Sequence, residues 1–109
     1  MTPTKNIFLI EDDNMKPFVS KGDLVVFEPM ALNQRVYNGV YIVEYRGKKQ
    51  VVRVQFLIRG DMLLIFDNKE NDTIKFKYHE RGRVIFIGHV VARYFKDGSY
   101  KIDYPHIEP

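Results

Sequence analysis

The sequence predicts a mainly β fold made of short, mostly antiparallel strands, with little or no helix. Apolar and β-branched runs of about five to eight residues recur between glycine turns and aspartate–asparagine turns. No window of about 11 residues has the i, i+3, i+4, i+7 apolar spacing of an amphipathic helix. Taken alone, this pattern fits several arrangements of short strands, including sandwiches and small barrels.

The expected strands follow the apolar runs in chain order. They are residues 6–10, 24–27, 40–45, 50–57, 62–66, 73–77 and 84–95. Arg46-Gly47 and Gly60-Asp61 predict tight hairpin connections, because glycine accepts the positive φ that a two-residue reversal needs. Asp97-Gly98 predicts a last hairpin, which joins residues 92–96 to residues 99–104.

The composition limits the class of protein. At 109 residues the chain is long enough for one domain, and no repeat, low-complexity stretch or linker divides residues 1–109. The absence of cysteine excludes disulfides and thiolate metal sites. No run approaches about 18 consecutive apolar residues, and the N-terminus lacks the apolar core of a signal peptide. These features favour a cytoplasmic protein that is not inserted in a membrane. A net charge of +3 is too small to identify a nucleic-acid binder.

One motif near the N-terminus is more specific than the composition. Asp13, Met15, Pro17, Gly22 and Asp23 match the spacing of the pattern Gly-Asp-Ser-Met-x-Pro, four residues, Gly-Asp, which an apolar strand follows. This segment resembles the active-site turn of a LexA-like self-cleaving repressor domain, a serine peptidase with a signal-peptidase-like fold. The resemblance implies a complex of short antiparallel strands that form small barrel-like sheets.

The resemblance continues along most of the chain, in the same order. The family has an Asn/Pro-Gly turn, a strand, a glycine hairpin and a Val-Lys-Arg-Leu strand, and residues 38–54 are similar to this succession, with Arg53 at the arginine position. The family's Ser-Asp-Asn is similar to the run that ends in Asp67 and Asn68. Its closing Ile-x-Gly-x-Val-Val is similar to the run around Gly88.

The two catalytic positions of the family carry other residues in this chain. The family uses a Ser-Lys dyad in which a buried, neutral lysine takes the proton of the serine. Asn14 stands at the serine position, and its amide cannot attack a peptide bond. Val52 stands at the lysine position, where strand alternation places it on one face with Val54 and Phe56. We therefore expect a pseudo-peptidase and not an enzyme.

Other candidate sites have less support. Ser20, beside Lys21, and Ser99 are the remaining serines, and neither lies at a position that the resemblance supports. The acidic run 11–13 is better explained by turn hydrogen bonds than by a metal ion. The three histidines lack the spacing of metal ligands, and no glycine-rich cofactor motif is present. The sequence thus predicts no metal site and no cofactor.

Two alternative functions remain open on the sequence. A self-cleaving or signal-peptidase-like serine peptidase would need a nucleophile that these residues do not reveal. A small β domain that binds nucleic acid directly is suggested by three segments that interleave cations with aromatic rings. They are residues 75–78, 93–96 and 100–101. Alternation on a half-buried strand produces the same pattern, because it puts the aromatic side chains on one face and the charges on the other.

The resemblance implies a regulatory role. Domains of this family dimerise and bring together N-terminal helix-turn-helix domains that read two DNA half-sites. We expect a homodimerising, non-catalytic module of a phage-repressor-like transcriptional regulator, which contacts DNA only through a helix-turn-helix domain outside this chain. The C-terminal strands are the expected dimer interface. The residues expected there are Ile87, Val91, Tyr94, Phe95, Tyr100 and Ile102.

Overall fold

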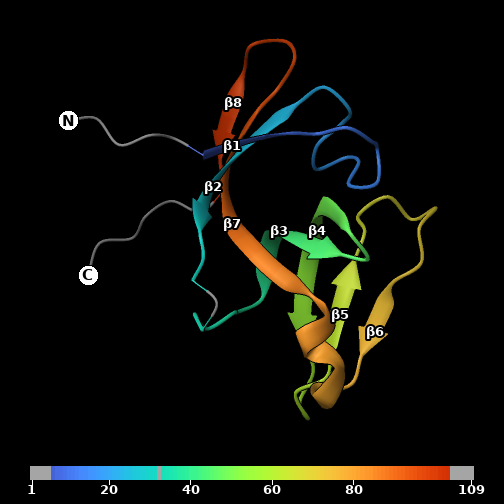
Figure 1. Cartoon of the computed structure of the whole chain (residues 1–109). Coiled ribbons are helices and arrows are strands. Elements are labelled where there is room, and N and C mark those ends of the chain that lie inside the picture. The colour runs from blue at the N-terminus through green and yellow to red at the C-terminus, as the bar shows by residue number, and fades with distance from the viewer. Residues whose placement is uncertain (1–5, 32, 104–109) are drawn as a thin grey trace.

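The computed structural model describes residues 6–31 and 33–103, and it confirms the mainly β prediction. Within these residues, eight strands form one antiparallel sheet (Figure 1). They are β1 (Asn6–Leu9), β2 (Leu24–Pro29), β3 (Gly39–Tyr45), β4 (Lys48–Phe56), β5 (Met62–Ile65), β6 (Ile74–Phe76), β7 (Ile85–Tyr94) and β8 (Tyr100–Ile102). A short 3₁₀ helix, η1 (Tyr78–Arg83), separates β6 from β7. None of the helices in the described residues is long and apolar enough to cross a membrane.

All seven predicted strands are present, and the predicted last hairpin forms between β7 and β8. The remainder of that predicted segment, at Tyr104, lies outside the described residues. The turn predicted at Gly60-Asp61 is wider than a two-residue reversal, because Leu57 N donates to Asp61 O across it at 2.8 Å. The helix η1 was not predicted, since its six residues are too few to show an apolar period. It begins where Glu80 Oε1 accepts a hydrogen bond from Lys77 N at 2.9 Å.

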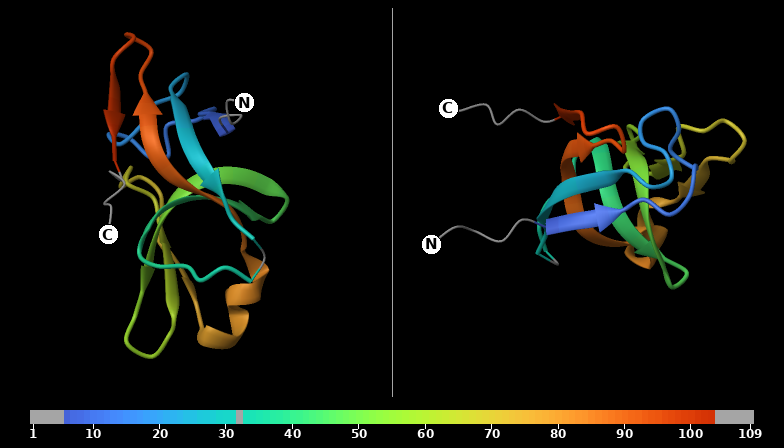
Figure 2. Two further views of the ribbon diagram at one scale, coloured as in Figure 1. Left: turned by 90° about the vertical axis from the view of Figure 1, so that its left-hand side faces the viewer. Right: turned by 90° about the horizontal axis from the view of Figure 1, so that it is seen from above.

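The longest strand, β7, connects two parts of the sheet. The strand order is β1-β2-β7-β3-β4-β5-β6, and β8 also pairs with β7. One edge of β7 pairs with β2, whereas the other pairs first with β3 and then with β8. The sheet therefore has two halves (Figure 1, Figure 2). The motif half contains β1, β2, β8, the C-terminal end of β7 and the motif loop, residues 10–23. The hairpin half contains β3 to β6 and η1.

Two clusters of buried apolar side chains form the core. The first consists of Tyr41, Val43, Val52, Val54, Met62, Leu64, Phe66, Phe76 and Val84. The second consists of Ile10, Met15, Val19, Val25, Val40, Ile42, Val51 and Val90. Strand alternation explains why β4 contributes to both clusters, since Val51 and Val52 point to opposite faces. The prediction that Val52 and Val54 share a buried face is confirmed, and the motif loop buries Val51 on the other face.

Candidate functional site

The motif loop connects β1 to β2 and is closed by polar contacts. At its base, Ile10 N donates to Asp23 O at 2.9 Å, and Gly22 N donates to Ile10 O at 2.8 Å. Across the loop, the Asp13 carboxylate accepts a hydrogen bond from Lys21 N at 2.8 Å. Backbone groups that have no strand partner must find other partners, and the aspartate of the motif provides one.

Asp23 is the buried anchor of the motif loop and is only 4% exposed. Its Oδ2 accepts from Ser20 N at 2.8 Å, and its Oδ1 accepts from Lys96 N at 3.0 Å. The same carboxylate thus joins the loop to the chain that follows β7. Gly22 has a φ of +96°, and a Cβ at this position would lie 2.7 Å from Cδ of Lys96. The positive φ explains why glycine precedes Asp23.

A second predicted motif lies against the first. Asn68 N donates to Asn14 O at 3.0 Å, and Asn68 Nδ2 donates to Asp13 O at 3.0 Å. Asp67 N donates to Sδ of Met15 at 3.4 Å. Residues from two motifs that are more than 50 positions apart in the sequence therefore contact one another.

Two ion-paired arginines lie next to the ring of Phe18. Arg53 donates from Nε and Nη2 to the Asp67 carboxylate at 2.8 and 2.6 Å, and this hydrogen bonding raises the pKa of Arg53 against the opposing effect of burial. Arg93 donates from Nε to Asp103 at 2.7 Å and from Nη1 to Phe18 O at 2.7 Å. The Cζ atoms of Arg93 and Arg53 lie 4.0 and 5.4 Å from the Phe18 ring centroid. These contacts fix the tip of the motif loop against both β4 and β7.

Sequence reasoning missed Phe18 and the pair of Arg93 with Asp103. Both charged residues belong to the predicted last hairpin, so the hairpin register could have suggested a cross-strand ion pair. No local pattern indicates that the motif loop packs beside that hairpin. The contact depends on the pairing of β7 with β2, which brings distant segments together.

The two positions that the resemblance aligns with the family's dyad have different surroundings. Asn14 is partly exposed, and its side chain has no hydrogen-bond partner among the described residues. Val52 is fully buried in the first cluster. Met15, which follows Asn14, packs with Val51 in the second cluster. The side chain at the lysine position therefore points into a different cluster from the one that contains the motif loop.

Two predicted motif residues, Pro17 and Gly88, take no part in these side-chain contacts. Pro17 is exposed at the tip of the motif loop. Gly88 lies in β7, where it pairs with Pro29 of β2 and Ile42 of β3. A Cβ on Gly88 would lie 2.1 Å from Cδ2 of Phe27, so glycine is required because the Phe27 ring crosses β7 at this point.

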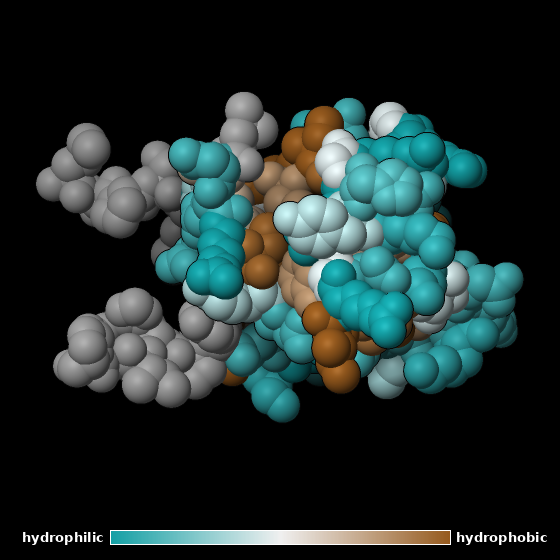
Figure 3. Space-filling view, turned by 90° about the horizontal axis from the view of Figure 1, so that it is seen from below, coloured by the Kyte–Doolittle hydropathy of each residue, from teal (hydrophilic) through white to brown (hydrophobic). Residues whose placement is uncertain are grey.

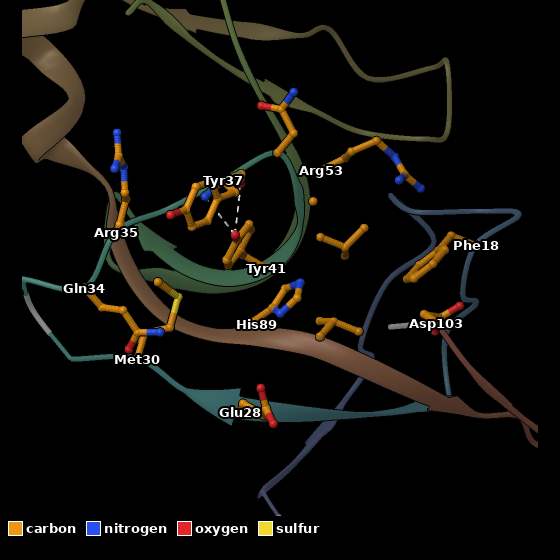
Figure 4. A pocket seen from close by; sticks show the side chains of 14 residues that line it. Phe18, Glu28, Met30, Gln34, Arg35, Tyr37, Tyr41, Arg53, His89 and Asp103 are labelled. Atoms are coloured by element: carbon orange, nitrogen blue, oxygen red, sulfur yellow. Dashed lines mark hydrogen bonds between the residues drawn. The ribbon is translucent and has the colours of Figure 1, made fainter. Parts of the chain in front are cut away.

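A pocket of about 510 Å³ opens beside the motif loop (Figure 4). Phe18 and Arg53 line it on the side of the loop, and Tyr41 and His89 line its inner part. The Tyr41 hydroxyl accepts from Tyr37 N at 3.1 Å and donates to Tyr37 O at 2.9 Å. The ring centroids of Tyr41 and His89 are 5.0 Å apart. The pocket thus has an ordered aromatic wall.

The polar groups of the pocket favour hydrogen bonding over nucleophilic chemistry. Burial lowers the pKa of His89 below its ordinary value of 6.5, although the nearby carboxylate of Glu28 opposes this effect. A histidine with a lowered pKa is neutral at pH 7 and offers one donor and one acceptor. The described lining residues include no serine, threonine, cysteine or lysine. This arrangement can bind a ligand but supplies no Ser-Lys pair.

Residues 75–77, in the first segment that interleaves cations with aromatic residues, follow strand alternation. Phe76 is 3% exposed within the first cluster, while Lys75 and Lys77 are exposed. This aromatic side chain is therefore not available for stacking on a base.

No family model matches the chain. No curated protein matches it either. Within the described residues, no group of three or more His, Cys, Asp or Glu side chains is placed to hold a metal ion.

Proposed function

We propose that this chain is a non-catalytic LexA-like domain that dimerises and serves as the regulatory module of a phage-repressor-like transcriptional regulator. The contacts among Asp13, Met15, Asp67 and Asn68 support the LexA-like assignment, because they join motifs that only the resemblance relates. Asn14 and Val52 at the dyad positions support the absence of peptidase activity. An apolar face of the sheet carries the proposal of a dimer.

This face, called the outer face below, belongs to the motif half. Residues paired directly across antiparallel strands place their side chains on the same face of the sheet. One row of such neighbours is Ile7, Val26, Ala92 and Ile102, and the next is Leu9, Leu24, Tyr94 and Tyr100. None of the eight residues is charged. The opposite face of the same strands is core, since Val25 is fully buried in the second cluster.

The outer face exposes large apolar side chains at both of its edges. Ile7 and Leu9 on β1 are 53% and 50% exposed, and Tyr100 and Ile102 on β8 are 59% and 55% exposed. A contiguous exposed apolar patch of this kind marks an interaction site. A second copy is the partner that fits best, because an uncharged face can meet itself across a two-fold axis without like-charge repulsion.

Only some of the residues that the sequence predicted for the interface lie on the outer face. Those on the outer face are Tyr94, Tyr100 and Ile102. Ile87 packs against the second cluster instead. Phe95 lies with its ring centroid 5.5 Å from Cζ of Arg93, and Val91 accepts a hydrogen bond from Asp103 N at 2.9 Å. The proposed interface therefore keeps three predicted residues and adds Ile7 and Leu9, which the sequence did not suggest.

Sedimentation equilibrium across a concentration series tests the dimer and its location. We expect a reversible dimer below about 100 μM, since many specific interfaces have micromolar dissociation constants. Ile102→Lys should weaken it by tenfold or more, because the ammonium would be desolvated in the interface. The matched control is Ile58→Lys, which changes a fully exposed isoleucine in the turn after β4 and should leave the dimer unchanged.

Two results would contradict this proposal. A strict monomer at about 100 μM would remove the dimerising role. A dimer that Ile102→Lys and Ile7→Lys both leave intact would exclude the outer face.

Incubation at alkaline pH, followed by intact mass measurement, tests the absence of peptidase activity. A Ser-Lys dyad accelerates as its lysine deprotonates, so a peptidase would produce fragments that increase with pH. We expect none, because neither dyad residue is present. Fragments that require the folded protein would overturn the non-catalytic assignment.

A further inference from the structure

A second open site, the aromatic groove, lies in the hairpin half, at the end of the molecule opposite β8. It has a volume of about 1040 Å³ and lies between residues 34–38, the turn after β4 and η1. Its aromatic residues are Tyr37, Phe56, Tyr78 and Phe86. Tyr37 and Tyr78 are each 63% exposed. Seen from this end, apolar surface lies between hydrophilic residues (Figure 3).

The guanidinium groups of two arginines lie over the rings of the aromatic groove. Cζ of Arg81 lies 4.3 Å from the Tyr78 ring centroid and 5.4 Å from that of Phe56. Cζ of Arg35 lies 5.7 Å from the Tyr37 ring centroid. No ion pair joins either arginine to a carboxylate within the part of the chain that the structure describes. The described lining of the groove also includes no aspartate or glutamate.

The positive charge of the chain is concentrated around this groove. Residues 33–38, 56–61 and 77–83 contain five arginines and lysines but only two carboxylates, a difference of +3 that equals the net charge of the whole chain. Both carboxylates are already engaged by the backbone. Asp61 accepts from Tyr78 N at 3.0 Å, and Glu80 accepts from Lys77 N at 2.9 Å. The groove is therefore complementary to a polyanion.

We infer that the aromatic groove binds single-stranded nucleic acid. Non-specific single-strand sites combine a positively charged groove with exposed rings on which bases stack, and this groove has both. Arg35 and Arg81 would contact phosphates, while the Tyr37 and Tyr78 rings would stack on bases. An extended acidic peptide is a poorer fit, because most of the groove lining comes from a loop, a turn and a helix, which provide no strand edge for a main-chain ladder. Of these four residues, only Tyr78 belongs to the segments that the sequence suggested for nucleic acid.

Fluorescence anisotropy with a labelled deoxythymidine single strand of about 12 nucleotides tests this inference, since one small β domain covers roughly 4–16 nucleotides. The wild-type chain should bind the single strand more tightly than a duplex of the same length. Arg35→Gln and Arg81→Gln should each weaken binding several-fold and reduce the slope of log K against log salt by about 0.7. Tyr37→Leu should weaken binding about tenfold, with little change in that slope.

Arg46→Gln is the matched control, because Arg46 also lies over a tyrosine ring, at 5.3 Å from Tyr45, but belongs to the turn between β3 and β4, outside the groove. It should leave binding unchanged. The inference would be overturned by no binding at about 100 μM protein. Equal weakening by Arg46→Gln and Arg35→Gln would overturn it as well. So would tighter binding of a labelled Glu- and Phe-containing peptide than of the single strand. None of these results bears on the dimer.

Discussion

In the motif half, irregular backbone between Ile10 and Asp23 is held by polar side chains, whereas in the hairpin half regular strand pairs enclose an apolar cluster. The motif loop depends on the carboxylates of Asp13 and Asp23 and on the ion pair of Arg93 with Asp103. The hairpin half satisfies its backbone through the pairing of β3 with β4, β4 with β5 and β5 with β6.

This difference explains why the longest motif, from Asp13 to Asp23, lies in the motif half. A paired strand satisfies its own N–H and C=O groups, so any apolar residue of suitable size serves on its inner face. A loop without strand pairing needs a defined donor or acceptor at each position. The motif half therefore requires particular residues at fixed spacing, and the hairpin half requires mainly alternation.

The largest expected effect tests the apolar core of the hairpin half. Val52→Lys places a lysine at a fully buried position of the first cluster, the position that the resemblance aligns with the family's lysine. Desolvation would lower the pKa of the new lysine far below about 10.4, and the free energy of unfolding at pH 7 should fall by about 4 kcal/mol. The unfolded lysine binds more protons than the folded one, so the loss should shrink as the pH rises towards about 10. Urea unfolding at pH 7 and at about pH 10 measures the loss of unfolding free energy.

Gln55→Lys is the control for this change, because Gln55 is exposed on the same strand. Its effect should stay within about 0.5 kcal/mol at either pH. If Val52→Lys were equally harmless, the first cluster would not be a closed apolar core, and the contrast between the two halves would fail.

Arg93→Met tests the polar contacts of the motif half. The side chains of Arg93 and Asp103 are 11% and 15% exposed, so the variant would leave a nearly buried carboxylate without its partner. Unfolding free energy should fall by about 3 kcal/mol, and amide exchange in the motif loop should accelerate. Lys48→Met removes an ion pair with Asp12 whose side chains are 59% and 39% exposed, and it should cost less than about 1 kcal/mol. Equal losses of unfolding free energy in Arg93→Met and Lys48→Met would show that the buried ion pair stabilises the fold no more than the exposed one.

Asp23→Ala isolates the contribution of the loop anchor. The change would leave Ser20 N and Lys96 N without the carboxylate that accepts both. We expect a loss of about 2 kcal/mol in urea unfolding, because buried donors that lose a charged acceptor keep their full desolvation cost. Asp97→Ala is the comparison, since the Asp97 carboxylate also accepts from a backbone N–H, that of Ser99, but lies in an exposed turn where water replaces it. A smaller loss in Asp23→Ala than in Asp97→Ala would argue against the anchor.

The sequence predicts the strands and the motif residues, but not the contacts between the motifs. The strands follow from alternation, which is a local property of β4 or β7. The resemblance selected Asp13 and Asn68 as motif residues, but their contact was not predicted, since nothing local relates two positions 55 residues apart. Alternation also marked Val52 as buried but left Val51 on the other face, because it does not indicate that the motif loop covers that face.

The outer face and the aromatic groove could not be derived in the same way. The row that contains Ile7 and Ile102 exists only because β1, β2, β7 and β8 are neighbours in that order, and strand order is set by non-local pairing. The groove combines Arg35 from a loop with Arg81 from a helix that was not predicted. Both surfaces are properties of the topology.

The smallest expected effect is at Asn14, the position that the resemblance aligns with the family's serine. Asn14→Ser changes a side chain without a hydrogen-bond partner in the described residues, so the free energy of unfolding should change by less than about 0.5 kcal/mol. Asn68→Ser is the matched control, because the Asn68 side chain donates to Asp13 O and accepts from Glu70 N, and its loss should cost about 1–2 kcal/mol. The new serine should also produce no fragments at alkaline pH, since it would lack a lysine at position 52 to remove its proton. A stability loss as large as that of Asn68→Ser would mean that asparagine at position 14 supports the motif loop.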